Sequence, residues 1–236
     1  MAVLVPFHRS ELTADEEISL RHARRFLAAY DRFAVAPASL EGGLDGFETE
    51  RFPDRHFTSA AAFSRLQLDA GLYRRFGGYD FVLLYQLDAL VLSDQLLEFC
   101  TGRFDYIGAP WIDVPWLDRP AVGNGGLSLR SVSGCLRVLE DRRYRLGGPS
   151  WHWRALSPLP RRLDRFRRGG NQDLFWSFDA PRRHPGFRVA PVEEGLRFAF
   201  ELEPRRCFEL NHGQLPFGCH AWARHDRAFW EPHLLT

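Results

Sequence analysis

Phe81-Val82-Leu83-Leu84-Tyr85-Gln86-Leu87-Asp88 is an apolar run that ends on an acidic residue. A short, nearly continuous apolar run predicts a buried strand of the kind found in parallel sheets. In an open α/β sheet, ligands bind outside the carboxyl ends of such strands. Asp88 is therefore a candidate for holding a metal or a phosphate-bearing ligand, although a lone acid at a strand end also caps turns.

Expected strands and helices alternate before this run. Strands are expected over 2–7 and 32–36, and helices over about 14–29 and 59–76. Thr13-Ala14-Asp15-Glu16 has the capping-box spacing that opens the first helix. The order strand, helix, strand, helix, strand predicts a doubly wound α/β fold.

The middle of the chain contains a repeated strand signal and a glycine-rich signal. Phe104-Asp105-Tyr106-Ile107 echoes Tyr79-Asp80-Phe81-Val82, which predicts two neighbouring strands. Gly123-Asn124-Gly125-Gly126 is expected to form a turn that leads into a strand and then a helix from about Val132. Asn171-Gln172-Asp173 is expected to open an aromatic helix, with Phe187–Ala190 as a strand and Val192–Phe200 as a helix beyond it.

Composition predicts one domain with one irregular insertion. A chain of 236 residues with 45% hydrophobic content can bury one sizeable core, so a single domain is expected over 1–236. An Arg-, Pro- and Trp-rich insertion is expected at about 144–169. Its Arg161–Arg168 cluster fits a solvated surface, a patch for a phosphate-bearing acceptor, or peripheral contact with the inner face of a membrane.

Charge and residue usage exclude several classes of function. The 31 basic and 30 acidic residues give a net charge of +1, which provides no global field for nucleic acid. The chain has no Lys, which excludes Schiff-base chemistry and a P-loop lysine. The four Cys form no C-x-x-C pair, and they are expected to be reduced and mostly buried in a cytoplasmic protein. No stretch approaches the roughly 20 apolar residues that span a bilayer.

Four features follow one another along the chain: Asp88, the glycines at 123–126, Asp173 and His220. Each has an ordinary explanation when taken alone. Asp88 could cap a turn and Asp173 could cap the start of a helix, and His220 could be a buried histidine with its hydrogen bonds satisfied. In this order they resemble the common core of GT-A-fold glycosyltransferases, in the nucleotide-diphospho-sugar transferase superfamily. That core has an Asp-x-Asp motif at a strand end, a glycine-rich loop, an acid opening a helix and a C-terminal His.

Five stretches resemble a bacterial family of uncharacterised GT-A-like proteins more closely still. They are Val5-Pro6-Phe7-His8-Arg9, Tyr85-Gln86-Leu87-Asp88, Ile107-Gly108-Ala109-Pro110-Trp111, Gly123-Asn124-Gly125-Gly126 and Phe217-Gly218-Cys219-His220-Ala221-Trp222. The resemblance implies a Rossmann-like, GT-A-like fold with a mixed, mainly parallel sheet flanked by helices. It also implies transfer of a sugar from a nucleotide-diphosphate donor to a glycan or lipid-linked acceptor in polysaccharide biosynthesis. UDP-linked donors are the commonest in this class.

The resemblance assigns chemistry to individual residues. Asp88 and His220 would bind Mn²⁺ or Mg²⁺, with Gln86 in the place of the first acid of Asp-x-Asp. Asp173 would be the general base of an inverting transfer, and its place at a helix start is expected to keep it ionised. Two other functions stay open. A non-catalytic sugar-nucleotide-binding module would explain why Gln86 replaces the first Asp of Asp-x-Asp, and a nucleotidyltransferase would share the same fold.

Other contacts are expected from the same resemblance. The expected donor contacts are His8, Arg9, Arg65, Gln86, Gly125 and Gly126. Arg65 could equally form a surface salt bridge. Trp111 and Trp116 could form an acceptor rim with Asn171 by stacking on a sugar ring, or they could close the core.

Overall fold

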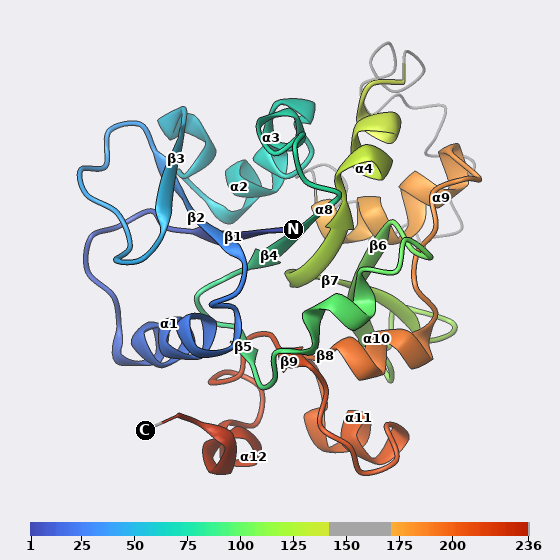
Figure 1. Ribbon diagram of the computed structural model, residues 1–236. Helices are drawn as coiled ribbons and strands as arrows, with labels where there is room; N and C mark the ends of the chain where they lie inside the picture. Colours follow the sequence, from blue (N-terminus) through green and yellow to red (C-terminus); the bar gives the residue numbers. More distant parts are fainter. Residues whose placement is uncertain (142–170, 236) are drawn as a thin grey trace.

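A six-stranded sheet in the order β3-β2-β1-β4-β7-β6 forms the centre of the protein (Figure 1). The computed structural model describes residues 1–141 and 171–235, so the insertion expected at about 144–169 lies outside the described residues. The pairs β1–β2, β1–β4 and β2–β3 are parallel, whereas β7 runs antiparallel to β4 and β6. The expected mixed, mainly parallel sheet is confirmed. The strands are β1 (Ala2–Pro6), β2 (Asp31–Pro37), β3 (Glu48–Phe52), β4 (Phe81–Tyr85), β6 (Tyr106–Trp111) and β7 (Ala121–Ser131).

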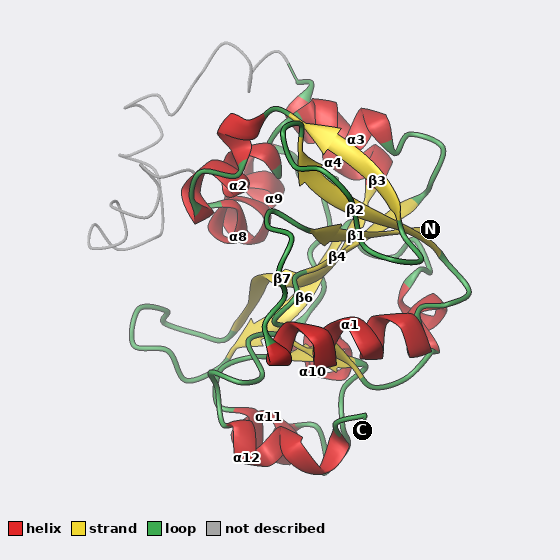
Figure 2. Ribbon diagram, turned by 90° about the vertical axis from the view of Figure 1, so that its left-hand side faces the viewer, coloured by secondary structure: helices red, strands yellow, loops and turns green. Residues whose placement is uncertain are grey.

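Helices cover both faces of this sheet (Figure 2). Alternate residues of a strand point to opposite faces, so Val3 and Val5 of β1 join one core cluster and Ala2 and Leu4 join the other. The first cluster packs under α1 (Ala14–Phe26) and α10 (Val192–Phe198). The second packs under α2 (Ala60–Leu66), α3 (Ala70–Arg75) and α4 (Val132–Leu139).

A second, smaller sheet in the order β5-β9-β8 lies beside the first (Figure 1). Its strands are β5 (Leu90–Val91), β8 (Ala199–Phe200) and β9 (Gly218–Cys219). It packs with Trp222 and Trp230 in a third cluster. The remaining helical elements are η1 (Asp54–His56), η2 (Gln95–Phe99), α8 (Gln172–Leu174), the π-helical turn η4 (Phe175–Asp179), α9 (Ala180–Arg183), α11 (Pro204–Leu210), α12 (Arg227–Trp230) and η5 (Glu231–His233).

The helix predictions are confirmed in part. The Thr13 side chain accepts from the Glu16 N–H and the Glu16 carboxylate accepts from the Thr13 N–H, so the capping box is present. The single helix expected over 59–76 is wrong, because α2 and α3 are separate. Asp69 explains the break, since its carboxylate caps α3 by accepting from Gly71 N at 2.8 Å.

The glycine turn expected at 123–126 is also wrong, because these residues lie inside β7. Close packing explains the glycines better than a turn does. A Cβ on Gly123 would collide with the Trp111 ring, and one on Gly126 would collide with the His220 imidazole. The glycines therefore let other groups approach the strand.

The strands and helices differ from the prediction in four further places. The two echoing segments start β4 and β6, which are not neighbours because β7 pairs with each of them. Strand β3 has the polar sequence ETERF and was not expected. Residues 187–190 form only an isolated bridge, between Val189 and Tyr106, and the last expected helix ends at Phe198 because residues 199 and 200 pair with β9.

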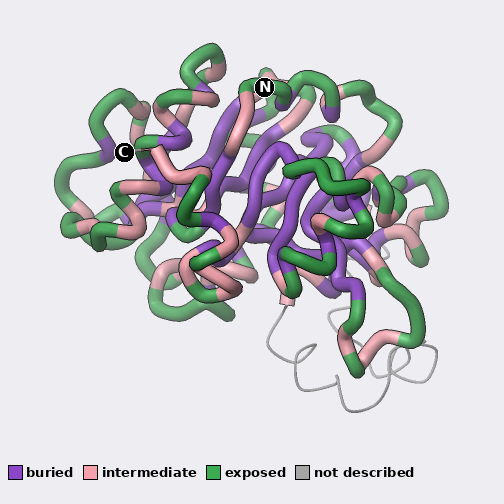
Figure 3. Tube along the Cα trace, turned by 90° about the horizontal axis from the view of Figure 1, so that it is seen from below, coloured by how far each residue is buried: buried purple, intermediate pink, exposed green. Residues whose placement is uncertain are grey.

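Buried residues concentrate along the strands, and exposed residues lie on the surrounding helices and loops (Figure 3). Cys135, Cys207 and Cys219 are buried and Cys100 is partly buried, as expected. No helix among the described residues is both long enough and apolar enough to cross a membrane.

Candidate active site

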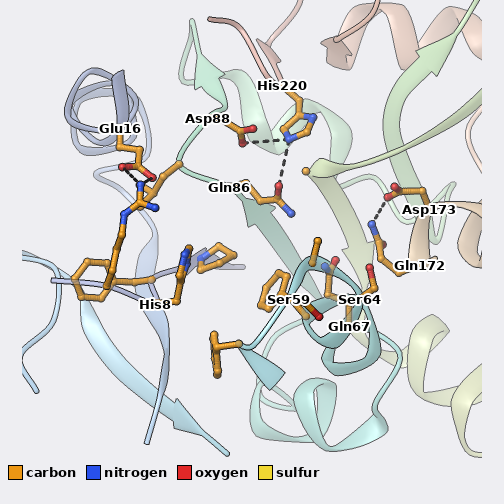
Figure 4. Close-up of a pocket in the computed structure, with 18 of the residues that line it drawn as sticks. His8, Glu16, Ser59, Ser64, Gln67, Gln86, Asp88, Gln172, Asp173 and His220 are labelled. Carbon is orange, nitrogen blue, oxygen red and sulfur yellow. Dashed lines mark hydrogen bonds and ion pairs between the residues drawn. The ribbon is translucent and has the colours of Figure 1, made fainter. Parts of the chain in front are cut away.

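A cleft of about 680 Å³ opens where β1 and β4 end (Figure 4). Two expected residues, His8 and Arg9, line it directly after β1, and Gln86 and Asp88 line it after β4. The other expected residues that line it are Gly126, Asn171, Asp173 and His220. The tertiary structure therefore brings together residues from both ends of the chain, at the carboxyl edge of the parallel strands.

A tight turn after β4 places Gln86 and Asp88. The Gln86 N–H donates to the Gly126 carbonyl at 2.9 Å, and the Ala89 N–H donates back to the Gln86 carbonyl at 2.9 Å. The Asp88 carbonyl accepts from Trp222 N at 3.2 Å, which ties the turn to the segment after β9. The Asp88 side chain is 54% exposed, so its carboxylate is accessible from the cleft.

His220 is held by polar contacts at both ring nitrogens. Its Nε2 lies 3.1 Å from Asp88 Oδ1 and 3.2 Å from Gln86 Oε1, and its Nδ1 lies 2.9 Å from Glu201 Oε1. The residue that follows it, Ala221, has a φ of 50°, a left-handed conformation that non-glycine residues rarely adopt. The ring is therefore fixed in orientation with Nε2 toward the cleft.

The two carboxylates keep His220 charged. Burial disfavours the cation, but the hydrogen bonds and charges of Asp88 and Glu201 outweigh it and raise the pKa of His220 to about 10. Burial also acts against the Asp88 carboxylate, yet His220 lowers the pKa of Asp88 below its ordinary value. At neutral pH these side chains form an ion pair.

Glu201 is a site residue that sequence reasoning missed. It directly follows β8, is buried, and accepts from Asn124 Nδ2 at 2.7 Å as well as contacting His220. The signal in the sequence was the same as for Asp88, since Phe198-Ala199-Phe200-Glu201 is an apolar run that ends on an acid. The expected helix over 192–200 concealed it.

Asp173 lies at the start of α8, next to β7. Asn171 caps this single turn, because its Oδ1 accepts from Asp173 N at 2.9 Å and from Leu174 N at 3.2 Å. The Gln172 amide donates to Asp173 Oδ1. Gly125 makes this approach possible, since a Cβ there would strike both Gln172 and Asp173.

The pKa of Asp173 is raised, although a helix start would lower it. Burial, and then the charge of Glu201, raise its pKa to about 6, against the opposing effects of Arg130, His220 and the Gly125 N–H. A helix of three residues contributes little dipole, so burial dominates. Asp173 is still mostly ionised at neutral pH, with a pKa close to the value that suits a general base.

Four of the expected residues lie outside the cleft lining: Arg65, Trp111, Trp116 and Gly125. Arg65 is exposed on α2. The buried Trp111 ring packs edge-on against Trp116 at 4.8 Å and stacks on Phe178 at 6.3 Å. Of the two explanations for Trp111, the structure therefore favours closure of the core. Gly125 also does not line the cleft, and it acts through its contact with Asp173.

Arg9 is already partnered at the rim of the cleft. Its guanidinium contacts both carboxylate oxygens of Glu16 at 2.6 Å, and its Nε donates to the Glu11 carbonyl at 3.1 Å. Glu16 also lines the cleft. The first turn of α1 therefore positions the Arg9 side chain.

Three donor atoms around His220 Nε2 could hold a divalent cation. They are the imidazole Nε2 itself, a carboxylate oxygen of Asp88 at 3.1 Å from it and the amide oxygen of Gln86 at 3.2 Å from it. Adjacent ligands of octahedral Mg²⁺ lie about 3 Å apart. Glu201 orients the ring through Nδ1, as carboxylates do for metal-binding histidines. Within 1–141 and 171–235, no group of three or more His, Cys, Asp or Glu side chains is arranged to hold a metal.

Comparison with solved structures identifies the fold. A glycosyltransferase involved in glycosylation of the major capsid of PBCV-1 is 13% identical, with a TM-score of 0.53 over 98% of this chain and 97% of that one. The galactosyltransferase LgtC is 12% identical, with a TM-score of 0.53 over 93% and 86%. Mouse xyloside xylosyltransferase 1 is 13% identical, with a TM-score of 0.53 over 92% and 96%. These likenesses show a GT-A glycosyltransferase fold.

Comparison of sequences gives the family. No curated protein matches the chain. A family model matches residues 46–220, which include β4, β7, α8 and His220 and so most of the cleft. The chain therefore belongs to the family described as "Protein of unknown function (DUF5672)".

Proposed function

We propose that this protein is a glycosyltransferase that moves a sugar from a nucleotide-diphosphate donor to an acceptor hydroxyl. One observation carries the proposal: Gln86, Asp88, Asp173 and His220 converge on one cleft at the carboxyl edge of a GT-A sheet. The neighbouring structure of LgtC contains donor and acceptor sugar analogs, which supports a ligand pair of this kind. The acceptor is expected to be a glycan or a lipid-linked sugar.

The charge of the cleft favours a metal-bound donor. Three carboxylates line it, those of Glu16, Asp88 and Asp173, against the two cations Arg9 and His220. Both cations already have carboxylate partners. A diphosphate would therefore enter a slightly negative cleft, which is unfavourable unless a cation accompanies it.

Asp88, His220 and the Gln86 amide are the residues that would hold Mn²⁺ or Mg²⁺, and His220 would release its Nε2 proton on metal binding. A bound divalent cation would neutralise charge on the departing nucleotide diphosphate. The imidazole favours Mn²⁺ over Mg²⁺. Diphosphate oxygens and water would complete the coordination, because Asp88 is the one carboxylate of this donor set among the described residues.

The panel that tests this function combines UDP-, GDP- and dTDP-sugars with and without Mn²⁺. We expect one nucleotide sugar to raise the melting temperature only when Mn²⁺ is present, and the same compound to release its nucleotide on turnover. Stabilisation without any nucleotide release or transfer would favour the sugar-nucleotide-binding module, for which Gln86 in place of an acid is the supporting observation. No stabilisation by any member would contradict both functions.

Asp173 is proposed as the general base. Its carboxylate would accept the proton of the acceptor hydroxyl while that oxygen attacks the anomeric carbon, opposite the leaving diphosphate. This attack forms the new glycosidic bond and breaks the bond to the diphosphate in one displacement, so we expect inversion at the anomeric centre. Proton NMR of the freshly formed product reports its anomeric configuration. A retained configuration would contradict the direct displacement.

A further inference from the structure

Arg130 is a fully charged side chain in the interior of the protein. It lies on β7 and is 1% exposed. The alternation of Leu127-Ser128-Leu129-Arg130 places the leucines in the core under α1 and turns Ser128 and Arg130 to the opposite face. Its guanidinium carbon lies 5.6 Å from the centre of the Tyr106 ring.

The guanidinium donates to neutral oxygens. They are Ser128 Oγ at 3.0 Å, Tyr73 Oη at 3.0 Å, Gln67 Oε1 at 2.9 Å, Gln172 Oε1 at 2.7 Å and the Gly125 carbonyl at 3.4 Å. Among the described residues, no carboxylate lies within ion-pair distance of Arg130. Burial of a charge without an opposite charge is unfavourable, and neutral side chains could fill the same space. The position of this charge therefore requires an explanation.

Two chains of hydrogen bonds lead from Arg130 to the Asp173 carboxylate. In the first chain, Arg130 donates to Gln172 Oε1. The other end of the same amide, Gln172 Nε2, then faces Asp173 Oδ1 and donates to it. In the second, the Gly125 carbonyl accepts from Arg130 and from Ser128 Oγ, and the Gly125 N–H donates to Asp173. Both groups that hold the carboxylate are thus held by Arg130.

We propose that Arg130 is a positioning residue for Asp173, whose carboxylate it orients through the Gln172 amide and the Gly125 peptide. The inference rests on the proposed function insofar as Asp173 is the base. Arg130 is well suited to this role because guanidinium stays protonated at any pH that proteins tolerate and its planar fork can donate to several acceptors at once.

The charges that face Asp173 come from three elements. Glu201, after β8, disfavours the ionised carboxylate, whereas Arg130 on β7 and His220 after β9 favour it. Tyr106 on β6 is neutral, because burial raises its pKa well above the ordinary value. Removal of Arg130 would leave burial and Glu201 opposed only by His220 and the Gly125 N–H. The pKa of Asp173 should then rise above its value of about 6.

The test compares Arg130→Met with Tyr73→Phe. Each removes hydrogen bonding at the same guanidinium, but Tyr73 contacts it at Nη1, whereas Gln172 accepts from Nη2. Gln172→Met breaks the link to Asp173 and keeps the guanidinium, and it provides the test should Arg130→Met not fold. Carboxyl-carbon NMR follows the titration of Asp173, with its signal assigned by its loss in Asp173→Asn.

We expect Arg130→Met to raise the pKa of Asp173 by about one unit or more and Gln172→Met to raise it by less. Tyr73→Phe should leave this titration as in the wild type and lower only the melting temperature. With Mn²⁺ and the nucleotide sugar that the panel identifies, kcat at neutral pH should fall about twofold in Arg130→Met from the lost ionisation of Asp173 and further from its lost orientation, with little change in KM. In an Asp173→Asn background, Arg130→Met should cause no further loss of kcat.

An unchanged Asp173 titration in both Arg130→Met and Gln172→Met would overturn the positioning role and leave Arg130 as a purely structural residue. The positioning role would also be overturned if Arg130→Met lowered kcat by the same factor in the wild type and in the Asp173→Asn background. Failure of the proposed function has a different signature, because the NMR titration needs no substrate. Full transfer by Asp173→Asn contradicts the base, whereas a shifted titration in Arg130→Met still supports the coupling.

Discussion

Asp173→Asn is expected to lower kcat by about 10² to 10⁴ while binding of the donor is retained, because it removes the proposed general base and keeps the shape of the side chain. In the wild type, kcat/KM should fall about tenfold per pH unit as the pH drops below about 6, where the carboxylate becomes protonated. Initial rates across pH, with the panel's active nucleotide sugar, measure both effects. Asp179→Asn is a matched control, since this carboxylate lies outside the cleft lining.

The same substitution is expected to stabilise the fold. The pKa of Asp173 rises from an ordinary value of 3.8 to about 6 on folding, so the folded state disfavours the ionised carboxylate. Stability is therefore lost as the pH rises from about 4 to 6, and the loss is constant above that range. A shift of this size corresponds to about 2–3 kcal/mol, or about 4–12 °C in melting temperature for a chain of this length.

Thermal melts of Asp173→Asn and wild type should accordingly differ most above pH 6 and converge near pH 4. The opposite result, a variant that is less stable at neutral pH, would show that the carboxylate contributes net favourable contacts and that burial does not dominate its ionisation. Unchanged kcat would contradict the base separately, so stability and catalysis are tested by independent readouts.

Asp88→Ala is expected to abolish the metal-dependent part of donor binding. The proposed metal ligands include one carboxylate, that of Asp88, so its loss leaves only an imidazole and an amide. The dissociation constant for the nucleotide with Mn²⁺ should rise about 100-fold, and stabilisation by Mn²⁺ with nucleotide should disappear. Titration calorimetry with and without Mn²⁺ measures the change.

The fold itself should tolerate Asp88→Ala, because this side chain is 54% exposed and His220 keeps its contact with Glu201. Glu17→Ala, an exposed acid on α1 outside the cleft, serves as the control for loss of a carboxylate. Wild-type activity and unchanged Mn²⁺ dependence in Asp88→Ala would eliminate Asp88 as a metal ligand. If the wild-type activity does not depend on Mn²⁺, the positive charge that neutralises the departing diphosphate would instead come from protonated His220, whose pKa is about 10.

Secondary structure and site residues could be predicted wherever they are determined by the sequence of one continuous segment. The run that forms β4, the capping box of α1 and the strands β1 and β2 follow from local hydrophobic and capping patterns. Asp88 was found in this way, because an acid at the end of a buried strand is visible without knowledge of the rest of the fold. Glu201 has the same pattern, and it was missed because its strand has only two residues.

The sequence alone determined the class of the fold, and it made Asp88, Asp173 and His220 candidate site residues because their order resembles that of the GT-A core. Only the tertiary structure decided how buried those residues are and which side chains and charges surround them. It made Gly123–Gly126 part of β7, set Glu201 against His220, and placed the partly buried Asp173 beside Gly125 with Gln172 between it and Arg130. Burial and long-range pairing arise from segments far apart in the chain, and these two terms determine the pKa values on which the chemistry depends.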